Sequence, residues 1–142
     1  MRHQKGFTIV ELLIVIVVIG ILAAITIVAY NGIQTRARDA KRTADISSIQ
    51  KAIELYKADN GIYPQPGNDN WGYDLSSLGP LLIPTYIASI PSDPKAGVGY
   101  SYVRGPIAND SYAILINYEA RAVCKRGVNS APTNWWGQAD CI

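Results

Sequence analysis

Glu11 is the residue whose position most restricts the chemistry open to this chain. It is the only charged side chain between Phe7 and Tyr30 in a run that is otherwise almost entirely apolar. A carboxylate at the middle of a bilayer costs roughly 2.5 to 3.5 kcal/mol, and less near the bilayer edge. Such a charge predicts a positively charged partner, and one interpretation is that this partner exists only after processing or assembly of the chain. Phe7 lies four residues earlier, about one helical turn away.

The run Phe7–Tyr30 is long enough to position that carboxylate inside a membrane, since about 20 apolar residues span a bilayer as a helix. The basic segment MRHQKG precedes it. Its charges, Arg2 and Lys5, predict that this end stays cytoplasmic and that the C-terminal part lies outside. The run exceeds the apolar region of a secretory signal and offers only weak cleavage matches. Three interpretations are open: a cleaved secretory signal, which these features disfavour, a plain anchor with Glu11 near its edge, and an anchor whose carboxylate serves assembly.

The sequence from Gly6 to Leu13, GFTIVELL, followed by the apolar run through Ile25, closely resembles the N-terminus of type IV pilins and of type II secretion pseudopilins. The resemblance implies that a prepilin peptidase cuts after Gly6 and N-methylates Phe7. It also implies that Glu11 pairs with the terminal amine of a neighbouring subunit. Many pilins carry a proline late in this run, which is absent here. We therefore expect any local melting to centre on Gly20, since glycine weakens a helix by roughly 1 kcal/mol relative to alanine.

The helical pattern continues beyond the apolar run to about Asp59, where Asn60-Gly61 supplies a stop signal. Apolar residues recur mostly at three- and four-residue steps, which predicts one buried face: Ile33, Ala37, Ala40, Ala44, Ile46, Ile49, Ile53 and Tyr56. A basic cluster lies near its start, formed by Arg36, Arg38, Lys41 and Arg42. This cluster could bind anionic headgroups, DNA or acidic residues of a neighbouring subunit, or it could be a solvated helix face.

Residues 61–142 predict a small head, with a loop over 62–73, a helical turn over 74–78 capped by Asp74 or Ser76, and strands over 98–104 and 111–118. Alternation places one face of the second strand against the long helix: Tyr112, Ile114, Ile116 and Tyr118. Residues 121–124 could add a third strand. A disulfide between Cys124 and Cys141 would close the loop 124–141, which resembles the C-terminal disulfide-bounded region of many pilins.

The predicted fold is therefore α+β and pilin-like: a long N-terminal helix packed against a small antiparallel sheet. The expected organisation is a leader at 1–6, a transmembrane and assembly helix at 7–30, its amphipathic half at 31–60, and the head at 61–142. The order of a Tyr-Pro pair, a Leu-rich turn, a Tyr-Ile…Ile-Pro…Asp-Pro segment and a Tyr-rich strand is similar to pilins and to the major pseudopilin.

The mature chain offers little catalytic chemistry, because its single histidine, His3, lies in the predicted leader. We expect no enzyme activity and no cofactor. Calcium remains open, since the type II secretion relatives bind it and carboxylates occur at Asp69, Asp74, Asp93, Asp110 and Asp140.

Loss of Arg2 and Lys5 with the leader lowers the net charge from +2 to 0, which gives no support for binding nucleic acid through bulk charge. Trp71, Trp135 and Trp136 could stack on sugars or bases, although a core or interface role is the simpler interpretation. Asn109 begins a glycosylation acceptor pattern.

The sequence predicts a structural subunit of a type IV pilus-like extracellular filament, a homopolymer joined through residues 7–30. The expected partners are the chain itself, a prepilin peptidase, the inner-membrane assembly machinery and, before assembly, the membrane. One alternative is a pseudopilin of a secretion or competence system. The other is a stationary membrane-anchored binding module for DNA or glycan. Roles in adhesion, motility or DNA uptake stay open.

Overall fold

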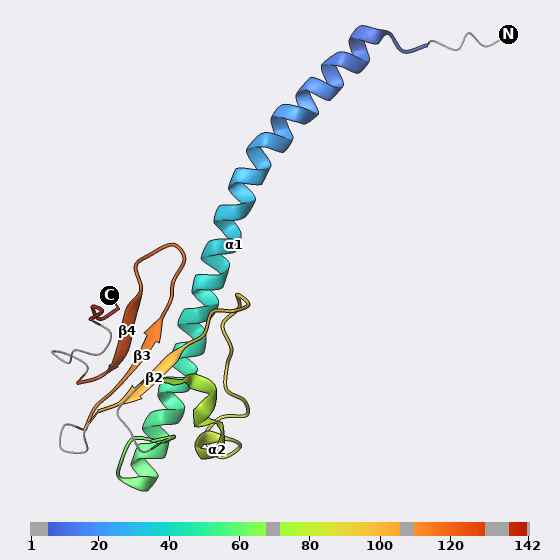
Figure 1. Ribbon diagram of the computed structural model, residues 1–142. Coiled ribbons are helices and arrows are strands. Elements are labelled where there is room, and N and C mark those ends of the chain that lie inside the picture. Colours follow the sequence, from blue (N-terminus) through green and yellow to red (C-terminus); the bar gives the residue numbers. More distant parts are fainter. Residues whose placement is uncertain (1–5, 68–71, 106–109, 130–136, 142) are drawn as a thin grey trace. The chain divides into compact units, whose positions relative to one another are not determined.

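A computed structural model describes residues 6–67, 72–105, 110–129 and 137–141 of the 142-residue chain (Figure 1). Of Val28, only the backbone is described. Several residues singled out from the sequence lie outside this part: Arg2, His3, Lys5, Asp69, Trp71, Asn109, Trp135 and Trp136.

Helix α1, Ile9–Asn60, confirms the long helix predicted from the hydrophobic pattern. It continues without interruption through Gly20 and through Asn31-Gly32. It ends where Gly61 adopts a positive φ of 75° and donates its backbone N–H to the carbonyl of Lys57 at 2.7 Å. Glycine tolerates this left-handed conformation, which satisfies a carbonyl at the helix end. The chain divides into two compact units, Met1–Thr35 and Arg36–Ile142, so the C-terminal part of α1 belongs with the head.

The head contains a four-stranded antiparallel sheet in the order β1-β2-β3-β4. The strands are β1 Tyr73–Asp74, β2 Ser101–Arg104, β3 Tyr112–Ile116 and β4 Cys124–Val128. The short helices η1 Leu75–Leu78 and α2 Gly79–Leu82 lie between β1 and β2. Asp74 caps η1 by accepting the Ser76 N–H at 2.8 Å, as expected from the sequence.

The position predicted for the third strand is wrong. Strand β4 begins at Cys124, where the predicted strand over 121–124 ends. The backbone N–H groups of Glu119 and Ala120 instead donate to the carboxylate of Asp39 on α1. These two amides lie directly before the predicted strand, so neither is available to extend a ladder on that side. The connection after β3 is therefore held against the helix, and pairing with β4 starts later.

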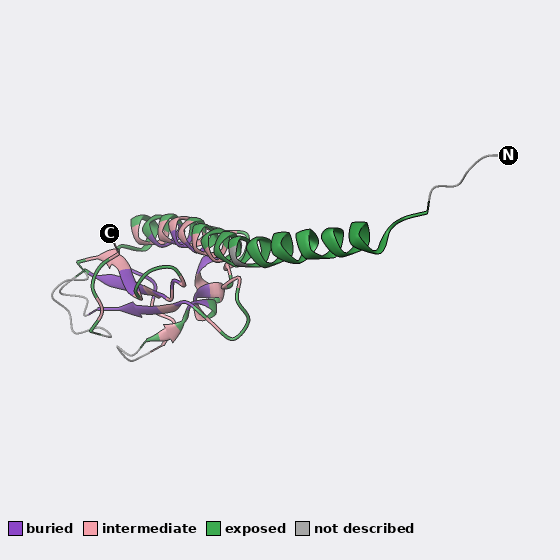
Figure 2. Cartoon of the chain, turned by 90° about the horizontal axis from the view of Figure 1, so that it is seen from above, coloured by how far each residue is buried: buried purple, intermediate pink, exposed green. Residues whose placement is uncertain are grey.

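The core lies between the sheet and the C-terminal half of α1, where three isoleucines are fully buried at successive turns: Ile46, Ile49 and Ile53 (Figure 2). The face of β3 predicted to cover the helix is also buried: Tyr112, Ile114, Ile116 and Tyr118. The prediction of a buried apolar helix face is wrong for its N-terminal part. Four of its residues are exposed: Ile33, Ala37, Ala40 and Ala44. In this stretch of α1, the buried residue on the face covered by the head is Arg42.

Candidate functional site

Thr8 and Glu11 form a reciprocal capping pair at the start of α1. Thr8 directly precedes the first helical residue, and its hydroxyl accepts the Glu11 backbone N–H at 3.3 Å. The Glu11 carboxylate in turn accepts the Thr8 backbone N–H at 2.8 Å and the Thr8 hydroxyl at 2.7 Å. This is the capping-box arrangement, which satisfies two amide groups that a helix leaves unpaired. The carboxylate also lies at the positive end of the helix dipole.

The predicted processing and assembly residues all lie in one accessible segment. Gly6 and Phe7 precede the helix, and the Phe7 residue is 85% exposed. Gly20 is exposed inside the helix and keeps helical geometry. In the uncut chain, Glu11 therefore contacts Thr8, the second residue after the predicted cleavage position. Cleavage, methylation and the intersubunit role of Glu11 stay predictions.

The segment from Phe7 to Tyr30 exposes an unusual amount of apolar surface. Every side chain described in it is exposed, including those of Leu12 and Leu13, which are more than half exposed. Within the described residues, α1 is the helix with the length and composition to cross a membrane. Contiguous apolar surface on this scale indicates a membrane or a protein partner.

A second feature, the polar clamp, joins α1 to two connections of the head. It comprises Arg38, Asp39, Arg42, Asp93 and Glu119. The Arg42 Nε and Nη2 atoms donate to the two Asp93 carboxylate oxygens at 2.7 and 2.8 Å, and neither side chain is exposed. The Arg42 Nη1 atom donates to Asp39 at 2.7 Å and lies 3.0 Å from Glu119.

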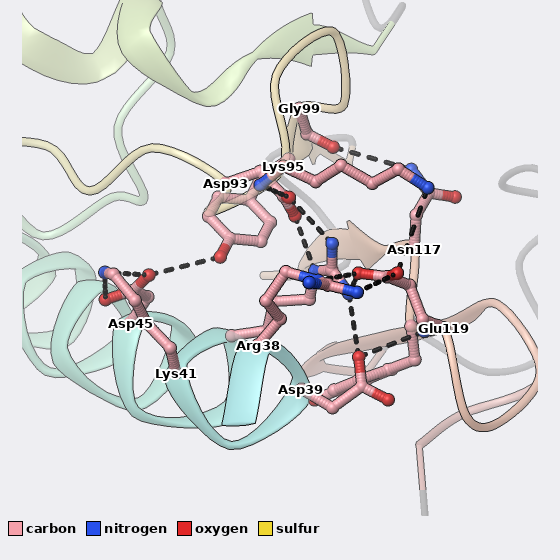
Figure 3. A network of polar contacts seen from close by, with 12 residues as sticks. Arg38, Asp39, Lys41, Asp45, Asp93, Lys95, Gly99, Asn117 and Glu119 are labelled. Atoms are coloured by element: carbon pink, nitrogen blue, oxygen red, sulfur yellow. Dashed lines mark hydrogen bonds and ion pairs between the residues drawn. The ribbon is translucent and has the colours of Figure 1, made fainter. Parts of the chain in front are cut away.

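Glu119 is held by a second two-point contact. The Arg38 Nε and Nη2 atoms donate to its carboxylate oxygens at 2.7 and 2.8 Å (Figure 3). These hydrogen bonds, with those from Arg42, lower the pKa of Glu119 to about 2 despite its partial desolvation. The hydrogen bonds with Asp93, opposed by burial, raise the pKa of Arg42. Burial opposes ionisation of Asp93, but hydrogen bonds from Arg42 and the Lys95 backbone outweigh it and lower its pKa.

These contacts change the interpretation of the predicted basic cluster. Arg38 and Arg42 bind carboxylates of their own head, and Lys41 pairs with Asp45 one turn along the helix at 2.8 Å. Arg36 is exposed. Three of the four cations are thus engaged within the chain, which argues against a dedicated surface for DNA or anionic lipid at this position.

The predicted disulfide is present: the Cys124 and Cys141 sulfur atoms are 2.08 Å apart. Asp69 lies outside the described residues, and three of the other carboxylates considered for calcium have partners within the chain. Asp93 binds Arg42, Asp110 pairs with Lys57, and Asp74 caps η1. Among the described residues, no three His, Cys, Asp or Glu side chains are grouped so that they could hold a metal ion.

Two parts of this arrangement were not anticipated from the sequence. The first is the capping pair, which the sequence could have predicted, because the Thr8-x-x-Glu11 spacing directly before an apolar run is a capping-box signal. The Arg42–Asp93 contact joins residues 51 positions apart and has no local signature.

Comparisons with known proteins agree with the N-terminal resemblance. The family described as "Prokaryotic N-terminal methylation motif" matches residues 1–27. "Type II secretion system core protein G" of Escherichia coli (strain K12) is 32% identical over 141 residues, covering 93% of this chain and 91% of that protein. The proteins of the same name from Aeromonas hydrophila and Pseudomonas aeruginosa are 34% and 30% identical, covering 66% and 80% of this chain and 68% and 84% of theirs. No solved structure matches the chain.

Proposed function

The chain belongs to the type II secretion system core protein G family, a type IV pilin-like family, and on this premise we propose that it is a pseudopilin, the structural subunit of a short secretion filament. The observation that carries this proposal is a folded head joined to an exposed apolar helix segment, with the Glu11 carboxylate in the first turn of that helix. A helix exposing this much apolar surface requires lipid or other helices around it. A filament subunit meets both environments in turn, first in the membrane and then in the filament core.

The proposed pathway begins with a membrane-anchored precursor whose head lies outside the cytoplasmic membrane. Prepilin peptidase cuts between Gly6 and Phe7 and methylates the new terminus. The capping pair with Thr8 holds the Glu11 carboxylate at the helix start, where the new amine of a neighbouring subunit can reach it. Pairing two charges that are both costly in an apolar surrounding favours one axial position of each subunit over others.

The names of the relatives favour the secretion filament over the surface pilus that was our main expectation from the sequence. Both are filaments built from processed subunits, so the pilus is the less specific interpretation. For the alternative of a stationary membrane-anchored binding module for DNA or glycan, the DNA version loses its main support, because Arg38, Lys41 and Arg42 pair with carboxylates of the same chain.

We further propose that the role is structural and not catalytic. The support is compositional: the chain has one histidine, and the proposed cleavage removes it. No resident cofactor forms part of the proposal. Calcium binding by the head is a separate question, and a shift of the melting temperature on adding a chelator would reveal it.

Three variants of the full-length chain, expressed with its secretion machinery, test the role of the N-terminus. Glu11→Ala removes the charge and the hydrogen bonds of the carboxylate to Thr8. Glu11→Gln removes the charge but retains a residue that can complete a capping box. Thr8→Ala removes the hydroxyl's part of the cap and leaves the charge. Electron microscopy would count filaments, and membrane fractionation would measure insertion.

We expect both Glu11 variants to insert normally and to form few or no filaments, because charge pairing is lost in each. Thr8→Ala should assemble better than either. Normal filament numbers in Glu11→Gln would show that the charge has no role in assembly. Loss of membrane insertion in the same variant would place its defect before assembly.

A further inference from the structure

In the C-terminal half of α1, the buried face presents nearly the same side chain at each turn. Ile46, Ile49 and Ile53 present the same side chain to the head at successive turns. Sliding the helix by one turn, about 5.4 Å, would bring one isoleucine close to the position of another. Apolar contact is non-directional, so these three isoleucines by themselves specify the axial position of the helix only weakly.

The polar clamp does not repeat in this way. If the helix moved so that Ile46 replaced Arg42, the Asp93 carboxylate would remain buried beside an apolar side chain. If it moved in the opposite direction, Arg42 would enter the apolar site of Ile46. Either displacement leaves a buried charge without its partner, which typically costs several kcal/mol. The clamp therefore opposes displacement in both directions.

The clamp also contacts both connections of the head that border this part of the helix. Asp93 belongs to the segment between α2 and β2, and its carboxylate additionally accepts the Lys95 N–H at 2.8 Å. Glu119 belongs to the segment between β3 and β4, and its own backbone N–H donates to Asp39 at 3.0 Å. Two segments far apart in sequence are thus fixed to one stretch of helix.

We propose that the polar clamp around Arg42 sets the axial register between α1 and the head, and keeps the head from sliding along the helix when the helix is pulled lengthwise. The source of that pull rests on the proposed function, in which assembly machinery withdraws the apolar segment from the membrane. The register itself depends only on contacts within residues 36–142.

Single-molecule pulling on the full-length chain in detergent micelles tests this inference. One DNA handle would be attached at Arg36→Cys, exposed on the helix before the clamp, and the other at Thr85→Cys, exposed in the head. Thr85 lies beside Tyr86, whose hydroxyl donates to Asp59 at 3.0 Å near the far end of α1. Force between the handles therefore runs mainly along the helix. The native disulfide stays intact, and the lifetime of the helix–head contact is measured at constant force.

The decisive variant replaces both partners, Arg42→Met with Asp93→Leu, so that neither is left as a buried charge without the other. Asp39 keeps its backbone donors at Glu119 and Ala120, and Glu119 keeps Arg38. Apolar replacements of a buried ion pair are often neutral for folding, so its melting temperature should remain near that of the parent chain. Its lifetime under lengthwise force should fall at least about tenfold, as expected for the loss of charge-assisted hydrogen bonds. Lys41→Met is the matched control, because Lys41 pairs with Asp45 of the same helix.

Equal lifetimes for the parent chain, the control and the double variant would overturn the inference. A shortened lifetime in the double variant alone would support it. Because single chains are pulled, the outcome does not depend on filament formation. A chain with a working clamp that never forms filaments would contradict the proposed function alone.

Discussion

The guanidinium group of Arg42 binds the carboxylate of Asp93 through two hydrogen bonds, and neither side chain is exposed to solvent. Two-point contacts of this kind are directional and charge-assisted. They form a polar, specific interface one helical turn before the apolar core of Ile46, Ile49 and Ile53. The head is consequently attached to α1 by two interfaces of different character.

Removing one partner of this pair should be costly. Arg42→Met leaves Asp93 buried without its cation, so we expect the free energy of unfolding of the head to fall by about 3 to 5 kcal/mol. Urea denaturation of the full chain in detergent, followed by fluorescence, would measure the change. Adding Asp93→Leu should recover much of the loss, and a double variant as unstable as the single one would contradict this explanation.

Acid should weaken the head only well below neutral pH. The Glu119 pKa falls from its ordinary value of 4.5 to about 2, and the pKa values of Asp39 and Asp93 are also lowered. A carboxylate with a lowered pKa stabilises the fold above its unfolded-state pKa, and this stability is lost as pH falls through the folded value. Stability should therefore change little between pH 7 and 5 and decline from about pH 4.5 towards 2. Glu119→Gln should flatten the decline, and a steep loss above pH 5 would count against these assignments.

Reduction of the disulfide should destabilise the C-terminal part of the head. Cys124 and Cys141 are 17 residues apart, and closing a loop of this length contributes roughly 3 kcal/mol in the chain-entropy model. We expect the melting temperature of the native chain to drop when a reductant is added. The Cys124→Ser/Cys141→Ser variant serves as the control, since its lower melting temperature should not respond to reductant.

Gly127 allows β3 and β4 to approach closely. It pairs with Ala113, and a Cβ atom at this position would overlap the carbonyl oxygen of Tyr112. Gly127→Ala should lower the free energy of unfolding by about 1 to 3 kcal/mol, as overpacking commonly does. Gly32→Ala on α1 meets no neighbouring atom and should be neutral or slightly stabilising. Similar effects of the two substitutions on urea denaturation would refute this role for Gly127.

Features with local signatures were predictable from the sequence. The extent of the helix to about Asp59, the Asn60-Gly61 stop, the Asp74 cap and the alternation along β3 each depend on neighbouring residues, and the structure confirms them. The clamp depends on pairing across 51 and 81 residues, so Arg38 and Arg42 resembled an exposed basic cluster. The start of β4 was misplaced for the same reason, because Asp39 binds the backbone of Glu119 and Ala120 from a distant helix.

The central claim is that this chain is a processed filament subunit, and N-terminal mass spectrometry of the membrane-bound protein tests it most directly. The protein would be isolated from cells with and without active prepilin peptidase. The account predicts a chain that begins at N-methylated Phe7 when the peptidase is active, and an intact MRHQKG leader when it is not. A chain that begins at Met1 in both cells, or one cut after the apolar segment, would contradict it.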